Sequence, residues 1–200
     1  SGGATGGAGD SVVFGGGGGL GRVGMFGSGA GGARIHHVVY VIDRSGSMTD
    51  TFYIVRQEML RSIGRLKPKQ DFHVVFFNDG PPLENPPKRL VPATREHKLD
   101  VGEYLGGITP RGSTDPIPAL ERAFDVLARA NSQPGKLIYL LSDGDFRNND
   151  KVAATVRKRN ARKDVHLNTI LFGQRSEAAQ RIMERISSEN NGKFTYKSPD

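Results

Sequence analysis

The sequence predicts a doubly wound α/β domain, with a mostly parallel six-stranded sheet and helices on both of its faces. Two observations support this prediction. From Arg34 onward, strand-like and helix-like segments alternate along the chain, and most of the strand-like segments are continuously apolar. Strands that alternate with helices indicate crossover connections between parallel strands. Continuously apolar strands are typical of parallel sheets that are covered on both faces. The 200 residues suffice for one such domain.

Three strands and two helices are expected in the first half of this domain. They are the strands at 37–42, 72–77 and 88–91, and the helices at 52–66 and 97–105. The first two strands are almost wholly apolar, and the first helix repeats apolar residues three and four positions apart. The third strand is short and is followed by Pro92, which favours the sheet edge because proline cannot donate a ladder hydrogen bond. A loop rich in Pro and Gly, at 78–87, precedes it.

Three helices and three strands are expected to follow. They are the helices at 117–130, 151–162 and 177–188, and the strands at 136–141, 165–172 and 193–197. In the last strand only Phe194 and Tyr196 alternate inward, so we expect it at the opposite edge. A strand order of 3-2-1-4-5-6, which is common in doubly wound sheets, places the strand at 37–42 beside the strand at 136–141.

Residues 1–33 are expected to form a Gly-rich, low-complexity tail or linker, and residues 34–200 the folded domain. Sixteen of the 27 glycines lie in the first 32 residues. Two short apolar patches there, 12–14 and 23–26, can still lie on the domain surface or at a sheet edge. Because the chain begins with Ser, we expect it to be a piece of a longer protein.

Composition limits the possible classes of protein. No apolar stretch approaches the roughly 18 residues of a membrane span, and no signal peptide is evident, but the compartment stays open. The absence of cysteine excludes a disulfide scaffold and a thiolate metal site. The net charge of +7 includes a basic segment at 151–163, which we interpret as the solvated face of a helix. A nucleic-acid surface is the less favoured alternative, because no aromatic residues interleave with these charges.

Oxygen-bearing side chains follow two strands that are predicted to be neighbours. Asp43, Ser45 and Ser47 follow the first strand, Asp143 follows the strand at 136–141, and Thr114 lies in the loop at 109–116. Each has a structural alternative as a helix cap or a turn residue. Together they suit Mg²⁺, Mn²⁺ or Ca²⁺ better than zinc or copper. A cation between the two carboxylates would also relieve their repulsion.

These residues resemble the metal-ion-dependent adhesion site of the von Willebrand factor A domain, the family that includes integrin inserted domains. The pattern Asp-x-Ser-x-Ser, a separate Thr and a later Asp is matched at all five positions, and the resemblance extends over about residues 34–197. It implies a Rossmann-like fold in which Ser45 and Ser47 bind the metal directly. It further implies that Thr114 binds directly or through water, and that the two aspartates bind through water or as exchangeable ligands.

The resemblance also implies a function. We expect a non-enzymatic, metal-dependent adhesion module with a divalent cation, Mg²⁺ first and Mn²⁺ or Ca²⁺ as alternatives, that bridges to a Glu or Asp of a protein partner. The motif phrases at 43–48 and 114–116 look more like those of bacterial members, in which the module is commonly part of a longer, exported or membrane-anchored chain.

Two other functions stay open. One is an RNA-binding module of this fold, which the positive charge favours mildly, although we do not expect a nucleic-acid partner. The other is a Mg²⁺-dependent phosphoryl-transfer enzyme of the haloacid-dehalogenase type. That class needs a second Asp two residues after the first for acid–base chemistry, and Ser45 occupies this position. We therefore predict no catalytic residues and no organic cofactor, and the oligomeric state stays open.

Overall fold

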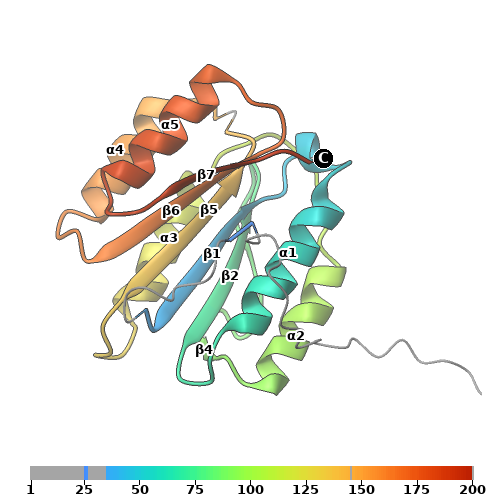
Figure 1. Cartoon of the computed structure of the whole chain (residues 1–200), viewed down its shortest axis with the longest axis vertical. Coiled ribbons are helices and arrows are strands. Elements are labelled where there is room, and N and C mark those ends of the chain that lie inside the picture. Colours follow the sequence, from blue (N-terminus) through green and yellow to red (C-terminus); the bar gives the residue numbers. More distant parts are fainter. Residues whose placement is uncertain (1–24, 27–34, 145, 200) are drawn as a thin grey trace, which may run out of the picture.

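The computed structural model describes residues 25–26, 35–144 and 146–199, and a central sheet runs through this part of the chain (Figure 1). Its strands are β1 (His37–Asp43), β2 (Asp71–Phe77), β3 (Leu83–Glu84), β4 (Val91–Pro92), β5 (Lys136–Ser142), β6 (Val165–Phe172) and β7 (Phe194–Lys197). The strand order is β3-β2-β1-β5-β6-β7, and β4 also pairs with β2. All pairs among β2, β1, β5, β6 and β7 are parallel. The predicted doubly wound, mostly parallel sheet is therefore confirmed.

Helices cover both faces of the sheet. They are α1 (Phe52–Arg65), α2 (Arg95–Gly106), α3 (Ile117–Ala128), α4 (Asn149–Arg159) and α5 (Glu177–Ser188), with a short 3-10 helix, η1 (Gly46–Met48). α1 and α2 pack on one face, and α3, α4 and α5 pack on the other (Figure 1). In the described part of the chain, no helix has the length and apolar character required to cross a membrane.

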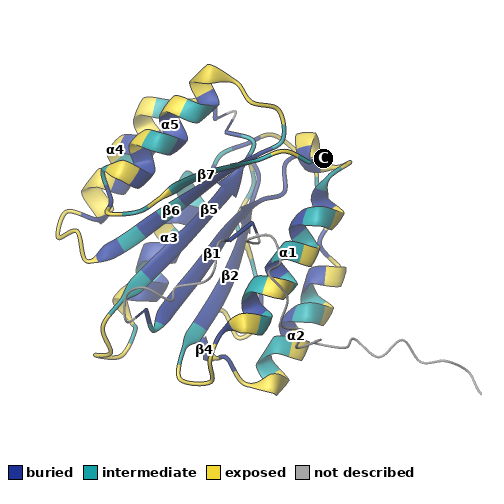
Figure 2. Ribbon diagram, viewed as in Figure 1, coloured by how far each residue is buried: buried dark blue, intermediate teal, exposed yellow. Residues whose placement is uncertain are grey.

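Burial explains why the central strands are apolar throughout. Every residue of β1 is buried, with Tyr40 in the cluster under α1 and Val39 in the cluster under α3. Figure 2 shows the same arrangement, with buried strands in the middle and exposed residues on the outer sides of the helices. Because β1 and β5 are adjacent and parallel, their carboxyl ends lie side by side at one end of the sheet.

The edge beside β2 differs from the prediction. The expected strand at 88–91 is wrong, since β4 contains only Val91 and Pro92, and β3 lies within the expected loop at 78–87. Both short strands run antiparallel to β2. Lys88 has a positive φ of 60°, which is incompatible with an extended strand at that position. The opposite edge is β7, as predicted.

Two residues of the predicted tail belong to the core. Met25 and Phe26 are 5% and 4% exposed and pack in the cluster beneath α1. The Phe26 ring makes edge contacts with Tyr40 and Tyr139 at centroid distances of 5.3 Å, and the Tyr139 hydroxyl donates to the Phe26 carbonyl at 3.0 Å. The rest of the predicted tail, including the patch at 12–14, lies outside the described residues.

Candidate metal centre

Asp43 organises the loop that follows β1. Its carboxylate is fully buried. Oδ1 accepts a hydrogen bond from the Ser45 backbone N–H at 2.7 Å, and Oδ2 accepts one from the Ser142 hydroxyl at 2.5 Å. The first bond turns the chain back on itself directly after the strand. The hydroxyl oxygens of Ser45 and Ser47 then lie 3.0 Å apart.

Asp143 joins this loop from the neighbouring strand. It follows the last residue of β5, and its carboxylate accepts a hydrogen bond from the Ser47 hydroxyl. Ser142 joins Asp43 to the turn around Asp143, because its hydroxyl donates to Asp43 and accepts from the Gly144 backbone N–H at 3.0 Å. Four of the five predicted residues thus lie in one hydrogen-bonded cluster.

The loop that carries Thr114 lies against the first loop. The Arg111 backbone N–H donates to the Arg44 carbonyl at 2.7 Å, and the Gly46 N–H donates to the Gly112 carbonyl at 2.9 Å. Thr114 follows two residues later and is buried. The structure thus brings the threonine loop to the cluster through backbone contacts.

Asn78 and Asp79, which follow β2, hold the threonine loop from its other side. The Asn78 side-chain amide donates to the Arg111 carbonyl at 3.0 Å, and the Asn78 carbonyl accepts from the Asp115 N–H at 3.3 Å. Gly112 has φ +77°, and a Cβ there would collide with the Asp79 carboxylate. Only glycine fits this turn without strain.

Sequence reasoning did not assign roles to Asn78 and Ser142. Asn78 follows β2 as Asp43 ends β1, and Ser142 directly precedes Asp143. A polar residue at the carboxyl end of a strand next to the site was the available signal.

Two arginines donate hydrogen bonds to backbone carbonyls where the threonine loop begins. Arg44 is only 4% exposed and its Nη1 donates to the Thr109 carbonyl at 3.3 Å, while Arg56 of α1 donates to the Ile108 carbonyl at 2.9 Å. Both arginines thus reach consecutive carbonyls at the start of the loop. The first loop, α1 and the threonine loop therefore form one connected unit.

The electrostatics of the cluster favour a bound cation. Burial raises the pKa of the Asp43 carboxyl to about 6, despite hydrogen bonds from Ser142 and Ser45 that lower it, and the nearby Asp143 charge raises it further. Two carboxylates held this close repel each other, and a divalent cation would favour the ionised form of both. The protein therefore offers a place where a positive charge is stabilising.

The donor set fits a hard cation. It consists of hydroxyl and carboxylate oxygens, which are ligands that Mg²⁺, Ca²⁺ and Mn²⁺ prefer. Over residues 25–26, 35–144 and 146–199, no cluster of three or more His, Cys, Asp or Glu side chains forms an alternative metal site. The carboxylates and hydroxyls at the carboxyl ends of β1 and β5 fit the expected metal.

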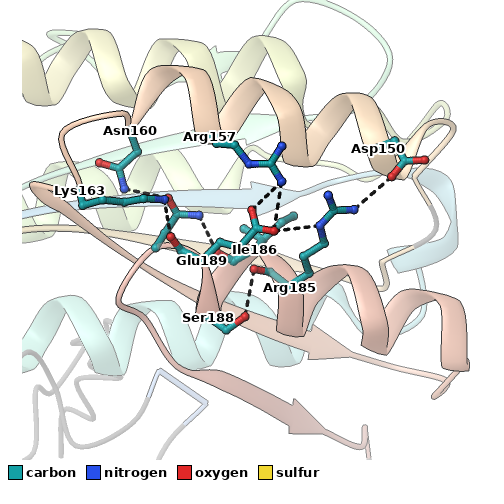
Figure 3. Close-up of polar contacts among 9 residues, drawn as sticks. Asp150, Arg157, Asn160, Lys163, Arg185, Ile186, Ser188 and Glu189 are labelled. Atoms are coloured by element: carbon teal, nitrogen blue, oxygen red, sulfur yellow. Dashed lines mark hydrogen bonds and ion pairs between the residues drawn. The ribbon is translucent and has the colours of Figure 1, made fainter.

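Three of the six basic residues in the segment at 151–163 contact neighbouring elements. Figure 3 shows Arg157 of α4 contacting the Glu189 carboxylate, which also binds Arg185 of α5 at 3.0 Å. Arg159 pairs with Asp125 of α3, and Lys163 donates to the Glu189 carbonyl. Half of the six basic residues therefore serve contacts between helices.

Fold and loop cluster together define a doubly wound α/β domain with an oxygen-rich site at the carboxyl ends of its central strands. The chain belongs to the von Willebrand factor type A domain family, whose model matches residues 38–145. It is 30% identical over 165 residues to human inter-alpha-trypsin inhibitor heavy chain H2, and 29% identical over 165 residues to bovine heavy chain H4. Each alignment covers 78% of this chain, which spans under a fifth (17% and 18%) of the length of these relatives.

Solved structures share the fold. A von Willebrand factor type A protein from Catenulispora acidiphila superposes with a TM-score of 0.73 at 20% identity, over 84% of this chain and 40% of that one. Manganese-loaded TRAP protein of Plasmodium vivax gives 0.66 at 16% identity, over 82% and 69%. Mussel byssus proximal thread matrix protein 1, with zinc in its MIDAS motif, gives 0.62 at 21% identity, over 90% and 44%. These proteins come from a bacterium, a Plasmodium parasite and a mussel, so the bacterial character of the motif phrases stays a prediction.

Proposed function

We propose that this chain is a metal-dependent protein-binding module. A divalent cation would be held by Ser45, Ser47 and Thr114, with Asp43 and Asp143 as outer or exchangeable ligands, and a Glu or Asp of a partner would complete its shell. The observation that carries this proposal is the hydrogen-bonded cluster of two aspartates and two serines from adjacent strand ends. Its hydroxyls face one another at a surface position, where Ser47 is exposed.

Mg²⁺ is the metal we propose, with Mn²⁺ and Ca²⁺ as alternatives. The all-oxygen donor set supports a hard cation. Two relatives of the same fold are described as metal-loaded, one with manganese and one with zinc in a MIDAS motif, which supports a divalent cation in this kind of site. The bound ion would supply a positive charge that attracts a partner's carboxylate, while the protein residues fix its position.

The relatives support a protein partner and an interaction role. They include heavy chains of inter-alpha-trypsin inhibitor, and a pilus adhesin, SpaC from Lactobacillus rhamnosus, has the same fold with a TM-score of 0.71 over 84% of this chain. None of these relatives is named as an enzyme. No aromatic residues interleave with the charges of the basic segment, which favours a protein over a nucleic acid, and Ser45 in place of a second Asp argues against phosphoryl transfer.

Titration calorimetry of Mg²⁺, Mn²⁺ and Ca²⁺ into chelator-stripped protein tests this proposal. We expect one saturable site in the wild type and its loss in Ser45→Ala/Ser47→Ala. A matched control is Ser132→Ala/Ser188→Ala, since both serines are exposed and lie outside the cluster. Equal binding by all three proteins, or no binding by the folded wild type, would contradict the proposal.

A further inference from the structure

Two exposed arginines lie beside the candidate metal centre. Arg111 belongs to the threonine loop and bonds through its backbone N–H to Arg44 of the first loop at 2.7 Å. Arg147 follows Asp143 by four residues, and its side chain is 67% exposed. Its guanidinium lies 3.6 Å from Asp79, whose carboxylate lies against Gly112 of the threonine loop. Both arginines therefore border the loops that carry the proposed ligands.

These guanidinium groups are available to a partner. Within residues 35–144 and 146–199, the Arg111 side chain makes no hydrogen bond or ion pair. The pair of Arg147 with Asp79 is exposed on both sides, and exposed pairs contribute little, so Arg147 can exchange it.

The carboxylates nearby are mostly engaged within the protein. Asp43 accepts from Ser45 and Ser142, and Asp143 accepts from Ser47. Asp115 accepts from the Ile117 backbone N–H at 3.0 Å, directly before α3. Among the described residues, the exposed acids of this region are Asp50, after η1, and Asp79, which pairs with Arg147, so Arg111 is the arginine there without an acidic partner.

We propose that the partner segment presents at least two acidic residues, one to the metal and another to Arg111 and Arg147. This inference rests on the proposed metal-dependent function and names the partner's chemistry. Carboxylate–guanidinium pairs add directional, charge-assisted hydrogen bonds beside the metal bond. An acidic polypeptide fits better than single-stranded RNA because base stacking needs a row of exposed aromatics. In the described part of the chain, Tyr53, at 60%, is the aromatic among the exposed large apolar side chains.

Three acetylated, amidated Gly/Ser peptides test the inference, with no Glu, one Glu, or two adjacent Glu. NMR titration of the Mg²⁺-loaded protein measures the weak affinities that such peptides have. We expect the two-Glu peptide to bind about tenfold more tightly than the one-Glu peptide, as one charge-assisted interaction of about 1.4 kcal/mol would give. In Arg111→Ala/Arg147→Ala this gap should fall below about twofold, while the one-Glu affinity and Mg²⁺ binding stay unchanged.

A charge-matched control is Arg65→Ala/Arg129→Ala. Both residues are exposed; Arg65 ends α1 and Arg129 follows α3, and these helices lead into the amino ends of β2 and β5, at the opposite end of the sheet. The control should keep the tenfold gap. A gap that persists in the first double variant, or that falls equally in the control, would overturn the inference.

Two further measurements distinguish a failure of this inference from a failure of the proposed metal-dependent function. If the one-Glu peptide binds with Mg²⁺ and is released by EDTA, the metal-dependent function stands whatever the gap between peptides. If it does not bind, the proposed function fails. Tighter binding of an oligouridylate than of the two-Glu peptide, lost in Arg111→Ala/Arg147→Ala, would overturn the acidic polypeptide in favour of RNA.

Discussion

Replacement of Phe26 by alanine tests whether the core extends into the predicted tail. Phe26 is 4% exposed, and removal of a buried aromatic side chain costs about 3–5 kcal/mol where the surroundings stay rigid. Its edge contacts with Tyr40 and Tyr139, each at a centroid distance of 5.3 Å, represent about 0.5–1.5 kcal/mol apiece within that sum. Because Phe26 comes from a short segment whose neighbours can relax, we expect a loss of about 2–4 kcal/mol in the free energy of unfolding.

Urea unfolding of the wild type, Phe26→Ala and Phe26→Leu measures this loss. The leucine variant keeps most of the apolar volume and should lose less than about 1.5 kcal/mol. A chain lacking residues 1–33 should lose at least as much as Phe26→Ala, because the bond of 2.7 Å from the Met25 N–H to Glu58 disappears too. A Phe26→Ala value within about 0.5 kcal/mol of the wild type would refute the reasoning and favour a domain that begins at residue 34.

Three other substitutions follow from the packing. Gly112→Ala should weaken Mg²⁺ binding at least about tenfold in calorimetry, because a φ of +77° strains alanine and the backbone of the threonine loop must shift to relieve that strain. Gly192→Ala should lower the free energy of urea unfolding by more than about 2 kcal/mol, since its Cβ would collide with the Leu167 carbonyl. Burial lowers the pKa of the His73 imidazole in the folded protein, so the unfolded chain binds a proton at this residue more readily. The free energy of unfolding should therefore decrease as pH falls below about 6.5. His73→Gln should lose less stability than the wild type between pH 7.5 and 5.5.

Each of these expectations has a contradicting result. Unchanged metal affinity in Gly112→Ala would mean that the threonine loop does not contribute to the site. A stable Gly192→Ala would mean that the approach of the last turn to β6 is looser than described. The same pH dependence with and without His73 would assign the acid destabilisation to other groups.

The central strands were predictable because burial on both faces imposes a simple composition. Every residue of β1 is buried, so the strand is almost wholly apolar and no other element fits that run. The edge strands lack such a signal. Glu84 lies in β3, which pairs with β2. Its carboxylate contacts the His73 ring at 2.8 Å and the Arg122 guanidinium at 2.9 Å, and these contacts join residues far apart in the sequence. A two-residue strand held by such contacts has no local pattern to detect.

The site was predictable to the extent that strand ends define it. Asp43 and Asp143 follow apolar runs that the strand order makes neighbours, so their convergence could be inferred. The bridging role of Ser142 could not, because it depends on side-chain direction at the end of β5. The patch at 23–26 was expected to be able to lie on the domain surface or at a sheet edge, but the burial of Phe26 in the core was not predicted, because it depends on the space beside Tyr40 and Tyr139.

The central claim is that the loops after β1 and β5 hold a divalent cation. Crystals of the chelator-stripped protein soaked in Mn²⁺, with data collected near the manganese absorption edge, test it most directly. We predict one strong anomalous peak in contact with the hydroxyls of Ser45 and Ser47 and close to Asp143, and its absence in Ser45→Ala/Ser47→Ala crystals. A peak elsewhere with none at these hydroxyls, or no peak at all, would contradict the claim.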